Sequence, residues 1–313
     1  MTTEILDDDV MAADTKLRVR YALIMPVRDE ENFLPAMAES VISQAIQPKR
    51  WIIVDDGSRD RTPEIARQLA RNFSFIQLIC LPNRAQRLPG GEGAIPSALR
   101  ELNLREYDYL ARFDSDLILS PDYMEKIFSE FEREPRLGIA GGGLYIESPD
   151  GLVFEESPED HIRGALKMYK MECFEEIGGM TADIGWDTID EVEARSRGWI
   201  TQSYPSIVAI HRRPTGTGIA SAKVFRSRGR AEYLTWSHPL FVFAKAFRTA
   251  WIYSPRVAVG YLYGFASCYL RSEERKRSRE FIRVRRKEQM QKLKVLFYRR
   301  QIQAKSSATK PAL

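Results

Sequence analysis

Cysteine is scarce in this sequence, with three residues in a chain of 313. Cys80, Cys173 and Cys268 are far apart, odd in number and without the short spacings of metal ligands. This pattern argues against a disulfide framework and is typical of a reducing compartment.

Long apolar runs are also missing. No stretch reaches the roughly 18 uninterrupted apolar residues of a membrane span. The first twenty residues are acidic and lack the apolar centre of a secretory signal. We therefore expect residues 1–19 to be a disordered N-terminal segment and the protein to be cytoplasmic.

Several catalytic signatures are absent as well. The sequence has no G-x-x-x-x-G-K-[ST] phosphate loop, and no G-x-G-x-x-G follows the first predicted strand. It also lacks the G-x-S-x-G elbow and the H-E-x-x-H zinc motif. These absences disfavour P-loop enzymes and the hydrolases that carry those motifs.

Positive charge is concentrated at one end of the chain. Residues 271–305 carry fourteen Lys or Arg and four Glu, a local net charge of +10 in a chain whose total is +4. The rest of the chain is therefore mildly acidic. Such a tail suits a membrane surface, a nucleic acid or an acidic partner, and charge alone does not choose between them.

The first half of the chain alternates between short apolar runs and helical patterns. Residues 21–26, 51–55, 75–81 and 109–113 are nearly continuous apolar runs, typical of strands buried on both faces of a parallel sheet. Helical spacing separates them. This alternation predicts an α/β fold, with an open, mostly parallel, Rossmann-like sheet and flanking helices.

After Asp116 the alternation of apolar runs and helical patterns ends. The patterns predict a helix, a glycine-rich strand, a second helix and one or two short strands, over residues 121–134, 137–147, 190–197 and 201–211. Aromatic and basic helical segments follow. We therefore predict one domain over residues 20–215 and a helical, basic C-terminal extension over 216–313.

Two aspartates interrupt the apolar character at the end of the fourth predicted strand. In YLARFDSDLIL, Asp114 and Asp116 directly follow the strand. Ligands of open α/β sheets bind at the carboxyl ends of strands, and two carboxylates converging in a turn suit Mg²⁺ or Mn²⁺. D-x-D is also a common turn sequence. Its place after a buried strand favours the metal site.

Acidic residues also follow the first two predicted strands. PVRDEE ends the first strand and VDDGS ends the second, so all three strand ends point carboxylates toward one rim. Asp55 and Asp56 are candidates to accept hydrogen bonds from a ribose or a base. Asp-Gly-Ser is a good turn in its own right, and both roles can hold at once.

The segment GWDTIDEVEARSRGW holds a candidate general base. Asp187 would lie just before a helix starting near Asp190, free to point into a cleft, or it would simply cap that helix. His211, one of three histidines, is a candidate metal ligand or a structural residue. Arg212 and Arg213 would neutralise a diphosphate or lie on the surface.

Taken together, these residues resemble the family 2 inverting glycosyltransferases with the nucleotide-sugar-binding GT-A fold. PVRDEE, VDDGSRDRT, FDSD and GWDTIDE with a later histidine occur in order and cover about residues 20–215. The resemblance implies Asp187 as the catalytic base, with Asp190 as the alternative. It also implies Mn²⁺ or Mg²⁺ bound by Asp114, Asp116 and His211.

The resemblance further implies a donor site for a UDP-, dTDP- or GDP-sugar and a glycan or lipid-linked hydroxyl acceptor. Its donor-binding residues would be Pro26, Arg28, Glu30, Asp55, Asp56, Arg84, Arg87 and Asp114. The chain departs from the family by placing Trp186 where an acidic residue usually precedes the base. It also lacks the Gln-x-x-Arg-Trp signature of processive synthases, which favours single sugar addition in cell-surface polysaccharide or glycolipid assembly.

Two other functions stay open from the sequence. A polyprenyl-phosphate sugar synthase would need a phosphate acceptor site. A nucleic-acid-binding protein would act through residues 271–313, although no recognition motif is found there and no nucleic acid is expected. The aromatic residues of 238–270, with the basic helix after them, predict peripheral contact with the inner face of the cell membrane or packing on the preceding domain.

Overall fold

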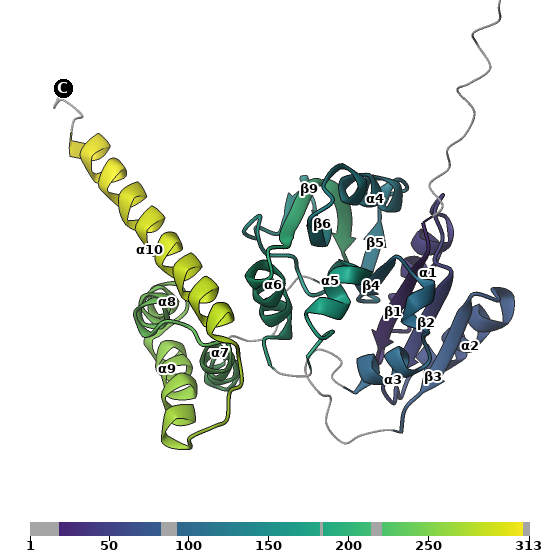
Figure 1. Ribbon diagram of the computed structural model, residues 1–313, viewed down its shortest axis with the longest axis horizontal. Coiled ribbons are helices and arrows are strands. Elements are labelled where there is room, and N and C mark those ends of the chain that lie inside the picture. The colour runs from purple at the N-terminus through teal and green to yellow at the C-terminus, as the bar shows by residue number, and fades with distance from the viewer. Residues whose placement is uncertain (1–18, 83–92, 182–183, 214–220, 309–313) are drawn as a thin grey trace, which may run out of the picture.

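The computed structural model of the chain describes residues 19–82, 93–181, 184–213 and 221–308. Within these ranges, one sheet of nine strands forms the centre and helices flank it (Figure 1). The strand order is β3-β2-β1-β4-β8-β6-β9-β5, and β7 pairs with β6. The strands are β1 (Tyr21–Val27), β2 (Arg50–Asp55), β3 (Ile76–Cys80), β4 (Tyr109–Phe113), β5 (Leu117–Leu119), β6 (Leu137–Ser148), β7 (Gly151–Phe154), β8 (Leu166–Lys170) and β9 (Ile200–His211).

The earlier helices cover both faces of this sheet, and the C-terminal helices form a separate group (Figure 1). They are α1 (Leu34–Ile42), α2 (Thr62–Asn72), α3 (Ala94–Arg100), the 3-10 turn η2 (Leu104–Glu106), α4 (Tyr123–Arg133), α5 (Met171–Glu176), α6 (Trp186–Ser196), α7 (Ala222–Leu234), α8 (Pro239–Ile252), α9 (Pro255–Leu270) and α10 (Arg279–Ala308).

The first four strands of the sheet order form the parallel half that the sequence predicts. β1 pairs in parallel with β2 and β4, and β2 pairs in parallel with β3. In β2 every residue after Arg50 is buried, as expected for a strand covered on both faces. Parallel pairing brings the loops after β1, β2 and β4 to one rim.

The other half of the sheet runs in mixed directions. β8 is antiparallel to β4 and β6, whereas β9 is parallel to β6 and antiparallel to β5. The predicted α/β class with flanking helices is confirmed, but the sheet is mixed rather than mostly parallel. Buried strands of either direction give the same continuous apolar run, so the sequence pattern does not distinguish them.

Side chains of β1 alternate between two helix layers. Leu23 and Met25 belong to the core shared with α1, α2 and α4, whereas Ala22 and Ile24 face the core shared with α3 and α5. All four side chains are fully buried. This double burial fixes the position of the loop that follows β1.

The structure corrects one local prediction, decides another and adds two elements. Helix α6 begins at Trp186 rather than near Asp190, so Asp187 lies in its first turn. The one or two strands predicted over residues 201–211 are a single strand, β9. β8 and α5 were not predicted, because two lysines among the five residues of β8 mask its strand pattern.

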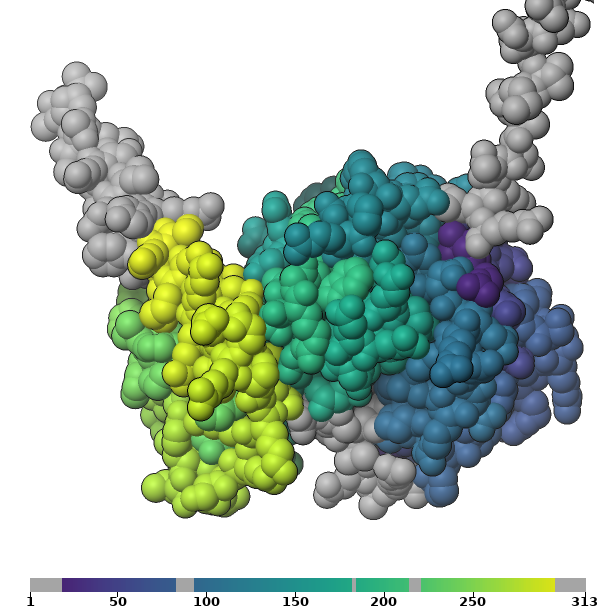
Figure 2. All heavy atoms as spheres, viewed as in Figure 1, coloured from purple at the N-terminus to yellow at the C-terminus, as the bar shows by residue number. Residues whose placement is uncertain are grey.

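The C-terminal helices α7–α10 form a lobe beside the sheet (Figure 2). Helix α10 runs along α6, to which it is joined by the ion pair between Arg195 and Glu288. The predicted boundary near residue 215 and the N-terminal segment up to residue 18 lie outside the described residues. In the described part of the chain, no helix is both long and apolar enough to cross a bilayer.

Candidate active site

The two aspartates after β4 lie in different surroundings. Asp114 has 37% of its side chain exposed, and its Oδ1 lies 2.8 Å from Nη2 of the buried Arg112. Asp116 is buried. The backbone N–H of Asp114 donates to the carbonyl of Ala165 at 2.9 Å, which ties this turn to the segment before β8. Both carboxylates therefore lie at the rim, but Asp114 is the more accessible.

Asp116 meets His211 and Arg213 because β5 pairs with β9. Leu117 lies opposite His211 in that antiparallel pair. Oδ2 of Asp116 is 3.8 Å from Nε2 of His211 and 2.8 Å from Nη2 of Arg213. The same Arg213 nitrogen is 2.7 Å from Oε1 of Glu30, which follows β1. Three separate segments therefore converge at one corner of the rim.

Glu155 orients His211 from behind. Its Oε2 lies 2.9 Å from Nδ1 of His211, while Nε2 faces Asp116. Burial alone would lower the pKa of His211, but hydrogen bonds to Asp116 and Glu155 raise it above its ordinary value. Burial would raise the pKa of Asp116, but His211 and Arg213 outweigh this and lower it. A carboxylate behind an imidazole is a common way to orient a metal ligand.

The donors at this corner suit a divalent cation. Oδ1 of Asp116 is buried and has no hydrogen-bond partner among the described residues. Asp114 adds an accessible carboxylate and His211 an imidazole nitrogen. Among the described residues, no group of three or more His, Cys, Asp or Glu side chains is arranged so that it could hold a metal ion by itself. Mg²⁺-type sites with one or two carboxylates are completed by substrate phosphates, and this donor set fits that kind of site.

The loop after β2 uses its two aspartates differently. Asp55 accepts hydrogen bonds from the N–H of Ser58, at 3.2 Å, and from its hydroxyl. It therefore closes the turn at Gly57, whose φ is +75°. Asp56 lies 3.7 Å from Nη1 of Arg28, and its buried Oδ1 has no hydrogen-bond partner in the part of the chain that the structure describes. Of the two, Asp56 has the oxygen that a ligand could use.

The other predicted donor-binding residues divide into two groups. Pro26 lies in β1 opposite Val54 of β2, and the buried Glu30 follows in the next loop. The structure therefore brings the PVRDEE and VDDGS motifs side by side. Arg84 and Arg87 lie outside the described residues.

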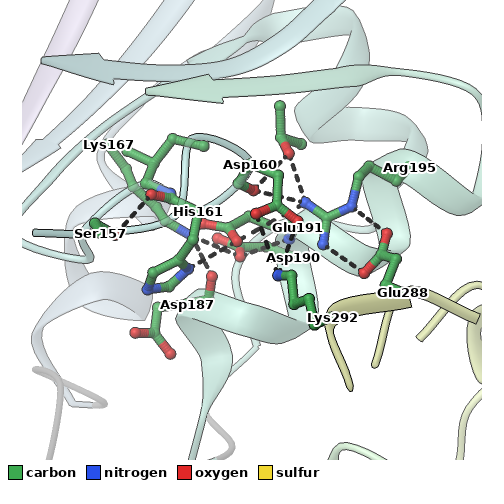
Figure 3. Close-up of polar contacts among 12 residues, drawn as sticks. Ser157, Asp160, His161, Lys167, Asp187, Asp190, Glu191, Arg195, Glu288 and Lys292 are labelled. Carbon is green, nitrogen blue, oxygen red and sulfur yellow. Dashed lines mark hydrogen bonds and ion pairs between the residues drawn. The ribbon is translucent and has the colours of Figure 1, made fainter. Parts of the chain in front are cut away.

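Asp187 projects from the first turn of α6. Gly185, at φ +87°, precedes the helix. The backbone carbonyl of Asp187 accepts a hydrogen bond from Nζ of Lys167. Its partly buried carboxylate makes no hydrogen bond or ion pair to any described residue, and it points away from the neighbouring polar network (Figure 3).

Asp190 and Glu191 lie inside that network, one turn further along α6. Nζ of the fully buried Lys167 is 2.8 Å from Oδ1 of Asp190 and 2.9 Å from Oε1 of Glu191. The hydroxyl of Tyr169 donates to Oδ2 of Asp190, and Nδ1 of His161 is 2.9 Å from Oε2 of Glu191. Both carboxylates are thus held by partners (Figure 3).

The two acids differ in the direction of their pKa shifts, although Lys167 lowers the pKa of both. Burial raises the pKa of Asp190 to about 6, although Lys167 and Tyr169 act to lower it. Burial would also raise the pKa of Glu191, but Lys167 and His161 outweigh it and lower that pKa. Burial would lower the pKa of Lys167, yet these carboxylates raise it. The network therefore keeps a charged lysine beneath the start of α6.

A short segment before β8 joins the aspartates after β4 to Asp187. The carbonyl of Gly164 accepts a hydrogen bond from Arg112, which also pairs with Asp114. A Cβ at Gly164 would lie 3.1 Å from the Trp186 ring and 3.4 Å from Cβ of Asp187. The guanidinium of Arg112 lies 5.1 Å from the centre of the Trp186 ring. A side chain at position 164 would therefore require the Trp186 ring to shift by a few tenths of an ångström.

Sequence reasoning missed Arg112, Glu155 and Lys167. Arg112 and Lys167 are opposite each other in the β4–β8 pair, and each is the polar residue inside a run of buried positions. A lone charge within a buried strand needs a charged or hydrogen-bonded partner. That signal was present in YLARF, but no sequence pattern identified the partner.

Comparison with known proteins gives a family model that matches residues 22–181, described as Glycosyl transferase family 2. The putative glycosyltransferase EpsH of Bacillus subtilis is 26% identical over 160 residues, 49% of this chain and 44% of that protein. Poly-beta-1,6-N-acetyl-D-glucosamine synthase of Staphylococcus aureus is 25% identical over 125 residues, 40% of this chain and 28% of that enzyme. The chain therefore matches less than half the length of these relatives.

Solved structures show the same fold at low sequence identity. The mannosyltransferase PcManGT from Pyrobaculum calidifontis, in complex with GDP-Man and Mn²⁺, has a TM-score of 0.53 at 17% identity, covering 83% of this chain and 75% of that one. GalNAc-T7 with UDP, GalNAc and Mn²⁺ has a TM-score of 0.57 at 11% identity, covering 76% of this chain and 52% of that one. The predicted GT-A fold is confirmed.

Proposed function

The chain belongs to glycosyl transferase family 2, and on that premise we propose that it transfers a sugar from a nucleotide-sugar donor to a hydroxyl acceptor with inversion. One observation carries the proposal. Pairing of β5 with β9 brings the buried Asp116 against His211 beside Asp114, at the carboxyl end of β4 where the fold binds ligands. The diphosphate of a donor sugar would complete the ligands of a cation there.

Asp114, Asp116 and His211 would hold Mn²⁺ or Mg²⁺, with Glu155 fixing the imidazole. The cation supplies positive charge that stabilises a departing nucleoside diphosphate. Arg213, which spans Asp116 and Glu30, adds a second positive charge at the same corner. The presence of Mn²⁺ with GDP-Man or UDP in structures of the same fold supports this assignment.

The nucleotide would lie across the loops after β1 and β2. Asp56 is the better candidate for the base or ribose, because one of its oxygens lacks a hydrogen-bond partner in the described residues, whereas Asp55 is engaged by Ser58. Arg28 lies beside Asp56, and Pro26 and Glu30 lie two residues before and two residues after Arg28 in the sequence. The donor would be a UDP-, dTDP- or GDP-sugar.

Asp187 is the proposed base. Its carboxylate takes the proton of the acceptor hydroxyl while the acceptor oxygen bonds to the anomeric carbon and the bond from that carbon to the diphosphate oxygen breaks. Attack occurs on the face opposite the diphosphate, so the configuration inverts. Asp190 is less suited to this role, because Lys167 and Tyr169 occupy both of its oxygens.

The relatives support the proposed class of acceptor. A poly-N-acetylglucosamine synthase is among the proteins that this chain resembles, which supports a glycan or lipid-linked hydroxyl acceptor in cell-surface polysaccharide or glycolipid assembly. The absence of the processive signature favours one addition per acceptor.

The proposal is tested with a panel of UDP-, dTDP- and GDP-sugars, each assayed with Mn²⁺ and with chelator. Asp187→Asn should lower turnover by about 10²–10⁴-fold and leave Mn²⁺-dependent nucleotide binding, measured by calorimetry, unchanged. Asp114→Ala should weaken both, because it removes a proposed cation ligand.

Asp150→Asn serves as the control, since Asp150 is exposed in the turn between β6 and β7. This variant should behave as wild type. Full turnover by Asp187→Asn would exclude Asp187 as the base, and undiminished turnover in chelator would exclude the cation.

A further inference from the structure

Helices α8 and α9 expose apolar side chains in two regular rows. On α8 the exposed row has spacings of three, four and four residues and consists of Leu240, Phe243, Phe247 and Trp251. On α9 the large exposed residues at the same kind of spacing are Val259, Tyr263 and Leu270. Trp251 and Leu270 are 86% and 87% exposed. Each row therefore lies along one side of its helix.

The opposite side of α9 is apolar too, and it is already packed. Gly264 lies against the backbone of Arg226 in α7, and Gly229 of α7 lies against the backbone of Tyr261. Phe265 and Val257 belong to the small core that the C-terminal helices share. A helix that is apolar on both sides is normally covered on both sides, yet here one side meets solvent.

The exposed charged side chains of the segment that holds these rows are all positive. Residues 221–272 contain eight Lys or Arg and one acidic residue, Glu232. Glu232 is buried, and its Oε1 lies 2.6 Å from Nζ of Lys245. Arg248 of α8 and Arg256 of α9 are exposed, and the guanidinium of Arg226 lies 4.6 Å from the centre of the Tyr263 ring.

We propose that this surface of α8 and α9, named here the aromatic–basic face, lies on an anionic lipid bilayer. Exposed Phe, Trp, Tyr and Leu side chains suit the boundary between headgroups and acyl chains, and the arginines suit the phosphates. The helices have 14 and 16 residues, fewer than the roughly 20 that a span needs, so they would lie along the surface. The proposal does not depend on the transferase chemistry.

Other occupants fit the face less well. A second copy of the chain would bring arginines against arginines, because the face offers no exposed carboxylate between residues 221 and 272. Single-stranded nucleic acid uses aromatic rings for base stacking, whereas Leu240, Val259 and Leu270 in these rows are aliphatic. Both serve as alternative outcomes of the test.

The test uses the full chain in co-sedimentation with vesicles of phosphatidylcholine, with and without phosphatidylglycerol. We expect binding to the anionic vesicles that weakens with added salt. The double variant Phe247→Glu with Trp251→Glu should bind at least about tenfold more weakly, because it places two carboxylates in the apolar row. Arg248→Glu with Arg256→Glu should remove the preference for phosphatidylglycerol.

Leu152→Glu with Val153→Glu is the matched control. These two side chains are 49% and 54% exposed, and they belong to β7, which pairs with β6 in the sheet, so the variant should bind as wild type. Far-UV circular dichroism checks that each variant is folded.

Four results would overturn the proposal. The first is wild-type protein that stays in the supernatant with anionic vesicles. The second is a Phe247→Glu, Trp251→Glu variant that sediments as the wild type does. The third is wild-type protein that binds an oligodeoxynucleotide but no vesicles, and a variant that no longer binds the oligodeoxynucleotide. The fourth is a wild-type dimer in sedimentation velocity that the same variant dissociates.

Discussion

The ammonium group of Lys167 has no exposed surface and contacts two carboxylates and one carbonyl at the start of α6. Its removal would leave Asp190 and Glu191 buried without their cation. A buried charge that loses its partner is far more costly than an exposed one. The residue therefore stabilises the helix turn that carries Asp187.

We expect Lys167→Met to lower the free energy of unfolding by roughly 3–5 kcal/mol, measured by urea denaturation. The matched control is Lys49→Met. The Lys49–Glu106 pair has a similar distance, 3.1 Å, but both side chains are about half exposed, so the change should be about 1 kcal/mol or less. Equal losses in the two variants would contradict the role of burial.

At the scale of residues, sequence analysis proposed the candidate site residues that belong to a motif but missed the residues that hold them in position. The family resemblance implied that Asp114, Asp116 and His211 form one metal site, and the structure brings Asp116 and His211 within 3.8 Å. Lys167 and Glu155 belong to no motif. Their importance comes from contacts across distant segments, which periodicity does not encode.

At the scale of elements, helices α7 and α9 cross with their backbones in close contact. A Cβ at Gly229 would overlap the carbonyl oxygen of Tyr261 and lie 2.9 Å from the backbone nitrogen of Phe265. Neither atom belongs to a flexible side chain. The two helices can approach this closely because glycine lines the contact.

Gly229→Ala should therefore destabilise the protein by roughly 1–3 kcal/mol, although alanine is the better helix former by about 1 kcal/mol. Thermal unfolding followed by circular dichroism measures the change. Ser227→Ala, at an exposed position of α7, should change little. A Gly229→Ala variant as stable as wild type would show that the crossing is looser than described.

Element prediction succeeded where the pattern was strong and failed where it was mixed. β1, β2 and β4 are uninterrupted apolar runs and were placed to within a few residues. α6 starts four residues earlier than predicted, because Gly185 in a left-handed conformation begins the helix without a capping side chain. A cap without a polar side chain leaves little signal in sequence.

In the whole molecule, α10 joins the C-terminal helices to the sheet domain. Nε and Nη2 of Arg195 in α6 lie 2.7 and 3.1 Å from the two carboxylate oxygens of Glu288. Lys292 lies 3.0 Å from Asp160. Figure 3 shows that the Arg195–Glu288 pair continues the network of Asp190 and Glu191.

Glu288→Ala should loosen this connection. We expect faster amide hydrogen exchange in α10 and in α6, and a loss of about 1.5–3 kcal/mol for the two hydrogen bonds between charged groups. Glu280→Ala is the control in the same helix, because its pair with Arg283 is largely exposed. Unchanged exchange in α6 would mean that α10 does not support it.

The contact of Asp116 with Arg213 joins residues 97 positions apart in the chain, and the three residues of β5 pair with β9 alone. During translation, the D-x-D turn leaves the ribosome long before its partners. A nascent chain that ends before β9 has strands β1–β4 but lacks His211 and Arg213, the partners of Asp116. The contacts of Asp116 therefore form late, once β9 lies between β6 and β5 in the sheet.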